Sequence, residues 1–235
     1  MDADGVHTEA MPRTARASRG GWCYHVVNRG NRQADVFHAA ADFLAFEGLI
    51  VEAQARAGVS LLAACLMPNH IHLVIRPNAD DDMAAWMHWL LTTHVRRFHA
   101  RHSSSGRVWQ GRYKAFPIEQ DGHLLTVMRY VERNALRAGL VRRAESWPWG
   151  SLAWRIGRVP GPPIADPPLP LPSDWVGYVN EPQTSAELEA IRGCARREAP
   201  FGSRAWAASV AGDLGLDEGP PPAPQVEVSA RAGKP

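Results

Sequence analysis

Apolar residues along the first two thirds of the chain follow two alternating patterns, one typical of strands and one typical of helices. Strand-like runs are expected at 23–28, 59–67 and 71–76, with a short one inside 108–118. Helical spacing is expected at 40–57, from 80–82 to about 99, and at 121–135. The order β-α-β-β-α-β-α predicts an α+β fold: a ferredoxin-like βαββαβ antiparallel sheet with an added C-terminal helix that contains Tyr130.

A proline-rich stretch follows this region. Seven of the fourteen residues from Val159 to Pro172 are proline, which breaks helix and strand and predicts a stiff linker. Beyond it, a Thr184-x-x-Glu187 capping box begins one helix, and Ser203 begins a second. The expected organisation is a flexible basic arm (1–20), a folded domain (21–158), a Pro-rich linker (159–173), a two-helix C-terminal segment (174–216) and a disordered tail (217–235).

The length and composition of the chain exclude several classes of protein. With 235 residues, of which 45% are hydrophobic, the chain can bury a substantial core, so a fully disordered or collagen-like protein is excluded. No apolar run approaches the roughly 20 residues of a membrane helix, and no secretory signal is recognisable, so we expect a cytoplasmic protein. Cys23, Cys65 and Cys194 are far apart, which argues against a disulfide framework or a thiolate zinc site.

The formal net charge of +2 conceals an uneven distribution. Residues 1–158 hold 20 basic and 14 acidic side chains, whereas residues 159–235 hold 6 and 10. The excess is largest over 96–155, with 12 basic and 4 acidic residues. Most of the cations are Arg, which binds phosphate through paired hydrogen bonds, so a polyanionic partner is one interpretation. A solvated Arg-rich surface fits the same composition.

His70 and His72 are the clearest candidates for metal ligands. Residues i and i+2 of a strand project from the same face, so the two imidazoles would stand side by side. Such a pair, taken alone, more often only forms hydrogen bonds. Tyr130 and Asn134 share a face of the expected helix, and if that helix packs across the histidine strand, Asn134 Oδ1 would be a third ligand beside Tyr130 Oη. Periodicity alone favours a core tyrosine and a C-capping asparagine.

Other candidate metal sites are less favoured. The acidic triplet Asp80–Asp82 lies where a helix begins, so we interpret it as a cap that complements the helix dipole rather than as a metal cluster. The remaining histidines have no partner at ligand spacing and are assigned no chemistry: His25, His38, His88, His94, His99, His102 and His123.

Five sequence blocks occur in a fixed order. They are Tyr24–Asn31 (YHVVNRGN), Met67–Val74 (MPNHIHLV), Trp109–Tyr113 (WQGRY), Arg129–Val141 (RYVERNALRAGLV) and Trp147–Leu152 (WPWGSL). Together they resemble the single-tyrosine HUH transposases, specifically the REP-associated tyrosine transposases of the insertion-sequence superfamily, where REP denotes a repetitive extragenic palindrome. The resemblance covers residues 11–152 and, more loosely, 174–216.

This resemblance implies a ferredoxin-like catalytic domain over 21–158 that cuts and rejoins single-stranded DNA beside hairpins. Matched by position, His70, His72 and Asn134 would be metal ligands and Tyr130 the nucleophile, with Mg²⁺ or Mn²⁺ as cofactor. The basic stretch would then track phosphates, with two aromatic residues as stacking platforms for bases. The expected DNA contacts are Arg13, Arg16, Arg96, Arg97, Arg107, Trp109, Arg112, Tyr113, Lys114, Arg129 and Arg133.

Two of these assignments have open alternatives: Trp109 equally fits a core residue, and the N-terminal arginines fit a solvated tail. The leading hypothesis is a metal-dependent single-strand endonuclease and strand transferase that forms a 5′-phosphotyrosine. A domesticated non-catalytic binder of structured DNA or RNA and a hydrolytic metal phosphodiesterase are the alternatives. The expected partner is single-stranded or hairpin DNA, with no membrane, no nucleotide cofactor, and a monomer preferred over a dimer.

Overall fold

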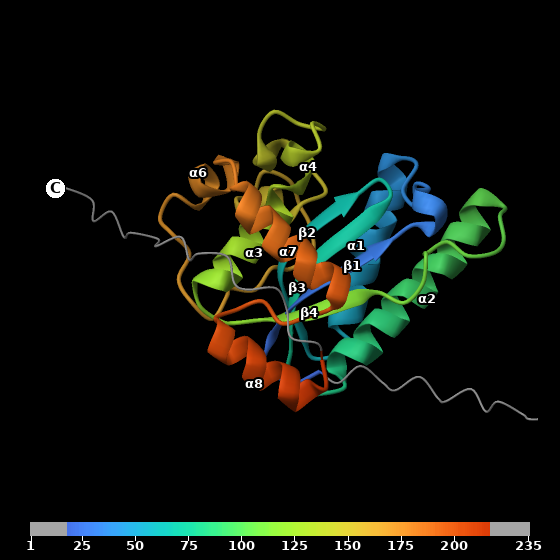
Figure 1. The fold of residues 1–235 in the computed structure, drawn as a ribbon. Coiled ribbons are helices and arrows are strands. Elements are labelled where there is room, and N and C mark those ends of the chain that lie inside the picture. The colour runs from blue at the N-terminus through green and yellow to red at the C-terminus, as the bar shows by residue number, and fades with distance from the viewer. Residues whose placement is uncertain (1–17, 217–235) are drawn as a thin grey trace, which may run out of the picture.

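A four-stranded antiparallel sheet forms the centre of the protein (Figure 1). The structure is a computed structural model that describes residues 18–216, so the expected tail and most of the expected arm, including Arg13 and Arg16, lie outside the described residues. The strands are β1 (Cys23–Arg29), β2 (Val59–Met67), β3 (His70–Pro77) and β4 (Lys114–Ile118). Their spatial order is β2-β3-β1-β4, and the β-α-β-β-α-β-α order along the chain is confirmed.

The register between β1 and β3 decides which side chains share a face of the sheet. Val27 pairs with His72, and Arg29 pairs with His70. Because side chains alternate along a strand, His70 and His72 lie on the same face as alternate residues of β1, including His25.

Two long helices cover the opposite face. They are α1 (Ala40–Gln54) and α2 (Asp82–His102), which pack on each other and on the sheet. Their core includes Phe46, Leu49, Trp86 and Leu90, together with Ile71 and Leu73 of β3. α1 ends three residues before the expected boundary, and α2 continues to His102, where Ser103 adopts a left-handed conformation (φ 47°).

The acidic triplet at the start of α2 binds backbone amides. Asp82 Oδ2 accepts a hydrogen bond from Ala79 N at 2.9 Å, and Asp80 Oδ1 accepts one from Gly20 N at 2.8 Å. Asp82 therefore serves the backbone at the helix start as expected, whereas Asp80 holds the segment before β1 and the N-cap residue Asp81 makes no side-chain cap hydrogen bond within the described range.

The histidine face of the sheet is covered by α3 (Gly122–Glu132). Asp121 caps this helix by accepting a hydrogen bond from His123 N, and Leu124, Met128 and Val131 are buried against the sheet. The expected single helix to residue 135 is divided: α3 ends at Glu132, Arg133 is its C-cap, and α4 (Asn134–Arg137) follows. Hydrogen bonds from Arg133 N to Arg129 O and from Arg137 N to Arg133 O keep the two helices nearly continuous.

Residues 144–165 run along the outer edge of β2. This segment contains a short 3-10 helix (Ala144–Ser146) and α5 (Ser151–Arg155). Leu66 N donates to Trp149 O, Ala64 N donates to Ser151 Oγ, and Ala165 N donates to Leu61 O. Val159 and Ile164 of the proline-rich segment pack on the core beneath α1 and α2. These contacts attach the segment to the body of the protein.

Three helices follow the proline-rich segment: α6 (Trp175–Asn180), α7 (Ser185–Arg197) and α8 (Arg204–Leu214). The Thr184–Glu187 capping box is present, whereas α6 was not predicted because it has only six residues. α7 lies beside α3 and β4 over the histidine face of the sheet (Figure 1). Phe201 N donates to Pro117 O and Glu119 N donates to Phe201 O, which attaches the segment before α8 to β4.

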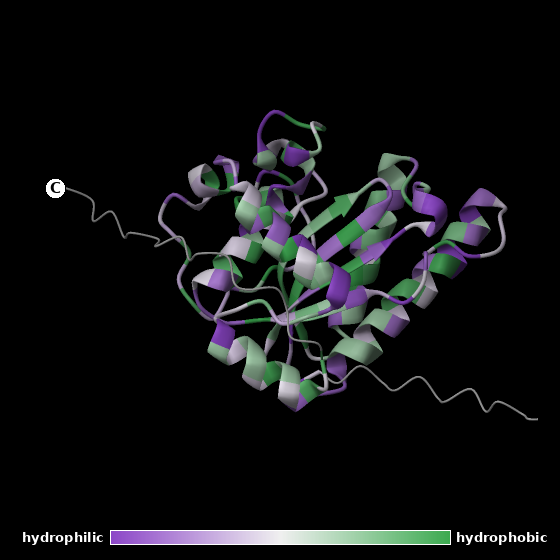
Figure 2. Cartoon of the chain, in the orientation of Figure 1, coloured by the Kyte–Doolittle hydropathy of each residue, from purple (hydrophilic) through white to green (hydrophobic). Residues whose placement is uncertain are grey.

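Hydrophobic residues concentrate in the strands, and the helices carry mixed faces (Figure 2). Such mixing is typical of helices that cover a sheet with one side and meet solvent with the other. Within residues 18–216, no helix combines the length and apolar character that crossing a membrane requires.

Candidate active site

A pocket of about 700 Å³ lies on the histidine face of the sheet. β1, β3, α3, α4, α7 and the residues before β4 all contribute to its wall. The structure brings together the four residues that the sequence singled out for chemistry, which are His70, His72, Tyr130 and Asn134. They come from two segments about 60 residues apart in the chain, which the packing of α3 on β3 places side by side.

The two histidines present their rings at right angles. Their ring centroids are 4.9 Å apart and the ring planes are inclined by 84°. His70 Nδ1 lies 2.6 Å from Asn69 Oδ1, and His72 Nδ1 lies 2.9 Å from His25 Nε2. Because each Nδ1 already has a hydrogen-bond partner, each Nε2 remains to bind a ligand.

Burial keeps these imidazoles neutral at neutral pH. It lowers the pKa of His70 to about 4, with the charges of Arg29 and Arg137 acting in the same direction. Burial also lowers the pKa of His72 well below its ordinary value, and the neighbouring His25 and His70 add to the effect. A neutral imidazole is the form that binds a metal ion.

Tyr130 faces the histidines from α3. Its ring centroid is 5.7 Å from that of His72, at an angle of 87°, and 6.0 Å from that of His25. The Arg137 guanidinium carbon lies 4.1 Å from the centroid of the Tyr130 ring, and Arg137 Nη1 donates a hydrogen bond to Tyr130 O at 3.3 Å. A guanidinium over the face of an aromatic ring is attracted by its π-electrons, so this contact holds Arg137 beside Tyr130.

The donor set fits a divalent cation. His70 and His72 offer two neutral nitrogens, and Asn134 offers an amide at the pocket wall. Asn134 is 4% exposed, and among residues 18–216 its Nδ2 has no hydrogen-bond partner, as is also true of Nδ2 of the neighbouring pocket residue Asn28. Unpaired buried amides at a pocket wall indicate a site arranged for a polar ligand.

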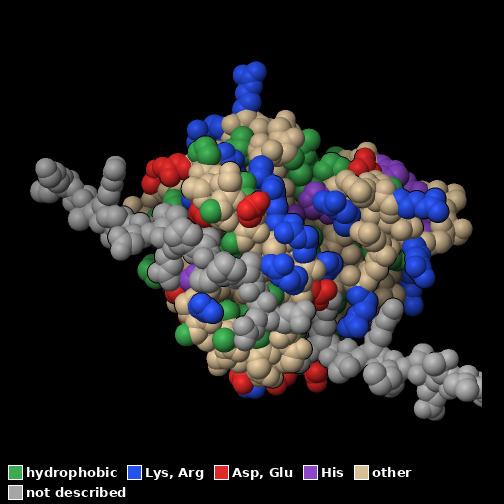
Figure 3. All heavy atoms as spheres, viewed as in Figure 1, with side chains coloured by type: hydrophobic (Ala, Val, Ile, Leu, Met, Phe, Trp, Pro, Cys, Tyr) green, Lys and Arg blue, Asp and Glu red, His purple; other side chains and the backbone are tan. Residues whose placement is uncertain are grey.

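Cationic side chains surround the pocket. Six line it: Arg29, Arg112, Lys114, Arg137, Arg192 and Arg196. Over the described range 18–216, no Asp or Glu lines the same pocket. Figure 3 shows Lys and Arg side chains gathered across the face over which α7 lies, with histidine beside them. The field inside the pocket therefore favours an anionic ligand.

A second group with metal-binding side chains lies at the start of α3, where Glu119, Asp121 and His123 are close together. His123 Nδ1 is 2.8 Å from Asp121 Oδ1, and Asp121 also caps the helix. Glu119 Oε1 and Oε2 accept hydrogen bonds from Oγ and N of Ser203. These carboxylates already serve the backbone and the start of α8, so we assign the group a structural role.

The structure divides the predicted DNA contacts into several sets. Arg112 and Lys114 line the pocket, as expected of phosphate contacts. Arg96, Arg97 and Arg107 are exposed outside the pocket wall, and Arg97 Nη2 forms an ion pair of 2.9 Å with Glu52 Oε1.

Trp109 and Tyr113 are core residues rather than stacking platforms. They are 6% and 7% exposed and belong to the apolar cluster beneath α1 and α2. The Trp109 ring packs at 5.2 Å from the His94 ring. We therefore correct the prediction that these two rings stack on bases, because neither presents a face to solvent.

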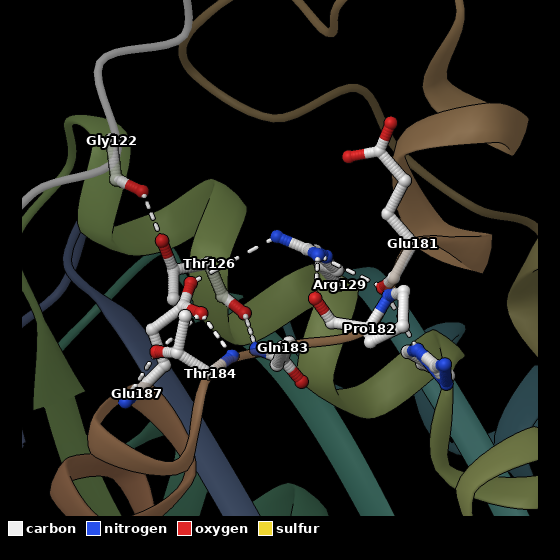
Figure 4. A network of polar contacts seen from close by, with 9 residues as sticks. Gly122, Thr126, Arg129, Glu181, Pro182, Gln183, Thr184 and Glu187 are labelled. Carbon is white, nitrogen blue, oxygen red and sulfur yellow. Dashed lines mark hydrogen bonds and ion pairs between the residues drawn. The ribbon is translucent and has the colours of Figure 1, made fainter.

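Arg129 (Figure 4) and Arg133 hold the C-terminal segment in place. Arg129 Nη2 donates to Glu181 O and to Pro182 O, both at 2.9 Å, and Arg133 Nε donates to Glu181 O at 2.9 Å. Arg129 Nη1 also lies 3.8 Å from Glu187 Oε1, with both side chains 4% exposed. Because these contacts engage the guanidinium groups away from the pocket, we withdraw both residues from the expected DNA contacts.

Besides Asn28, sequence reasoning missed one histidine and four arginines of the site and its surroundings. They are His25, Arg29, Arg137, Arg192 and Arg196. Arg137 had a signal, since it follows Tyr130 and Asn134 at helical spacing. His25 required the strand register, and the two residues of α7 required knowledge of where a distant helix packs.

Comparisons with known proteins identify a family model and individual proteins that this chain resembles. Residues 20–134 match the family model described as transposase, IS200 like. A curated protein of Haemophilus influenzae, named as a REP-associated tyrosine transposase, is 29% identical over 101 residues, covering 38% of this chain and 57% of that protein. The chain thus spans little more than half the length of this relative.

A solved structure of a REP-associated tyrosine transposase bound to a REP hairpin resembles the present fold. Its TM-score is 0.52 at 17% identity, covering 63% of this chain and 87% of that one. The likeness supports an α+β fold built on a four-stranded antiparallel sheet. Residues 20–134, which contain all four strands and the whole set His70, His72, Tyr130 and Asn134, match the family of IS200-like transposases.

Proposed function

We propose that this protein cleaves and rejoins single-stranded DNA beside a hairpin, through a covalent bond to Tyr130. The observation that carries the proposal is one pocket in which Tyr130, His70, His72 and six cationic side chains converge. A phosphodiester is the substrate that fits a tyrosine nucleophile in a basic pocket. A hairpin is the proposed partner because the related solved structure holds one.

The reaction is a transesterification. Tyr130 Oη attacks the scissile phosphorus, the bond from phosphorus to the 3′ oxygen breaks, and a 5′-phosphotyrosine and a free 3′-OH result. Attack by a 3′-OH on the phosphotyrosine reverses the step, so the phosphodiester energy is conserved and no ATP is needed. Arg137, stacked on the ring, stabilises the charge that develops on Tyr130 Oη as its proton leaves.

His70, His72 and Asn134 would hold the divalent cation, Mg²⁺ or Mn²⁺. When bound, such an ion polarises the phosphate and stabilises charge in the transition state. Arg29, Arg112 and Lys114 would bind neighbouring phosphates from the β1 end and the segment that enters β4. Charge on these side chains orients the strand so that its scissile phosphate faces Tyr130.

The test uses hairpin oligonucleotides with a single-stranded flank, incubated with the protein and Mg²⁺ or Mn²⁺. We expect a covalent protein–DNA adduct that denaturing electrophoresis resolves, and we expect Tyr130→Phe to abolish it. Tyr178→Phe is the matched control, because the Tyr178 hydroxyl on α6 is buried, has no hydrogen-bond partner among the residues that the structure describes, and lies outside the pocket.

Three outcomes would contradict the proposal. An adduct that persists in Tyr130→Phe would exclude this nucleophile. Cleavage without any adduct would indicate attack by water, and tight hairpin binding without cleavage under either metal would indicate a non-catalytic binder.

A further inference from the structure

Helix α7 contributes to the pocket although it lies outside residues 20–134, the part of the chain that the family model matches. Arg192, Ala195 and Arg196 of α7 form part of the pocket wall. Helix α7 belongs to the C-terminal region of the chain, where acidic residues outnumber basic ones. Two of the six pocket cations thus come from the acidic part of the chain.

The two faces of α7 have different roles. Glu187, Ile191 and Cys194 are buried against the body of the protein. Arg192 and Arg196 are exposed and four residues apart, so they lie on one face of the helix, toward the pocket. Lys114 Nζ donates to Arg196 O at 3.0 Å, which attaches the end of α7 to the start of β4. The packing of α7 therefore directs both guanidinium groups to the pocket.

The other end of α7 is fixed to the helix that carries Tyr130. Arg129, adjacent to Tyr130, donates to the two carbonyls before α7 and pairs with Glu187 in its first turn (Figure 4). Thr184 N in turn donates to Glu187 Oε2 at 2.7 Å. Because these contacts are largely buried, α7 keeps a fixed position relative to α3.

Like charges gather at the part of the pocket that Arg137 of α4 and Arg192 of α7 both line. Burial lowers the pKa of Arg137 from its ordinary value, and among its charged neighbours Arg192 acts in the same direction. With no carboxylate in this wall among the described residues, the repulsion between these cations is relieved by an anionic ligand.

We propose that α7 forms the second wall of a channel for single-stranded DNA, in which Arg192 and Arg196 bind backbone phosphates of the strand that is cut at Tyr130. This inference rests on the proposed function. It assigns the C-terminal segment to the DNA-binding site, with Arg129 as a positioning residue that sets the distance between the two walls.

The experiment measures binding of a fluorescent hairpin oligonucleotide with a single-stranded flank to the full-length chain over a range of salt concentrations. Loss of two phosphate contacts in Arg192→Gln/Arg196→Gln should weaken binding about tenfold and reduce the slope of log K against log salt by about 1 to 1.5. Arg197→Gln is the matched control, since Arg197 is exposed on the same helix and outside the pocket. It should bind as the wild type does.

Melting temperatures of the three proteins should agree, because these are substitutions of exposed side chains. Affinity and salt slope that are unchanged in the double variant would overturn the α7 channel while leaving Tyr130 chemistry intact. If the wild type forms no adduct, and affinity and salt slope fall in the double variant but not in Arg197→Gln, the channel is supported and the proposed reaction is refuted. A wild-type protein that does not bind the oligonucleotide would overturn both.

Discussion

His25 stacks on His72, one of the two proposed histidine ligands, and supports it from outside the pocket wall. Its Nε2 is 2.9 Å from His72 Nδ1, the two ring planes differ by 5°, and its own Nδ1 is buried without a partner in the described part of the chain. If His72 Nε2 is to bind a cation, the proton of the neutral ring lies on His72 Nδ1, which then donates a hydrogen bond to His25 Nε2. His25 then fixes both the tautomer and the orientation of the His72 ring.

His25 is not itself a proposed metal ligand, but its replacement should weaken metal binding because it orients His72. We expect His25→Leu to reduce the affinity for Mn²⁺ by about 10- to 100-fold, the range typical of lost ligand-orienting contacts. His25→Gln should recover part of this loss, because its amide oxygen can accept the hydrogen bond. Calorimetric titration of the protein with Mn²⁺ measures the effect, and equal affinities for the wild type and His25→Leu would refute the orienting role.

His94 is a buried histidine far from this chemistry. Its ring packs between α1 and α2 against Phe46, at 5.0 Å, and Trp109. Burial lowers its pKa to about 4; the charge of Asp42 acts in the opposite direction and only partly offsets this. In the unfolded chain a histidine has a pKa of about 6.5. Between these two values the unfolded state binds a proton that the folded state does not.

This difference predicts how stability depends on pH. The contribution of His94 is fully present above about pH 6.5 and is lost progressively as the pH falls toward about 4. His94→Gln should reduce the fall in unfolding free energy across this window by on the order of 3 kcal/mol, as measured by urea denaturation. His88→Gln, at an exposed site of the same helix, is the control. Identical pH profiles for His94→Gln and the wild type would contradict the prediction.

At the scale of elements, the buried Arg129–Glu187 pair joins α3 to α7 (Figure 4). Removing one partner leaves the other charge buried and unpaired, which costs about 3 to 5 kcal/mol in comparable pairs. We expect Arg129→Met to lower the unfolding free energy by about this amount, as measured by urea denaturation. Adding Glu187→Met should recover part of the loss, since no charge then stays unpaired.

Arg133→Met provides the comparison for this pair. Arg133 is less buried and donates one hydrogen bond from its Nε to Glu181 O, so its loss should cost only about 1 kcal/mol. If Arg129→Met were no more destabilising than Arg133→Met, the ion pair would not be what holds α7 to α3.

At the scale of the whole molecule, the sequence predicted what depends on local pattern. The strand that presents His70 and His72 follows from alternation. Helical spacing places Tyr130 and Asn134 on one helix face, but only the resemblance to the transposases assigned them a chemical role. The sequence left open whether Trp109 is buried and did not predict that Arg129 faces α7 instead of the pocket, because both depend on how distant elements pack. The charge of the C-terminal region was a misleading guide, since Arg192 and Arg196 lie on the face of α7 that meets the pocket.

The segment along β2 has a consequence for assembly. Backbone groups at the outer edge of β2 form hydrogen bonds with residues 147–165. Leu66 O accepts from Trp147 Nε1, Leu62 O accepts from Arg155 Nη2, and Ala64 N donates to Ser151 Oγ. An exposed strand edge is a template on which another chain can add a strand, and here that template is occupied. Two copies of this protein can therefore merge their sheets through β2 only if this segment first detaches.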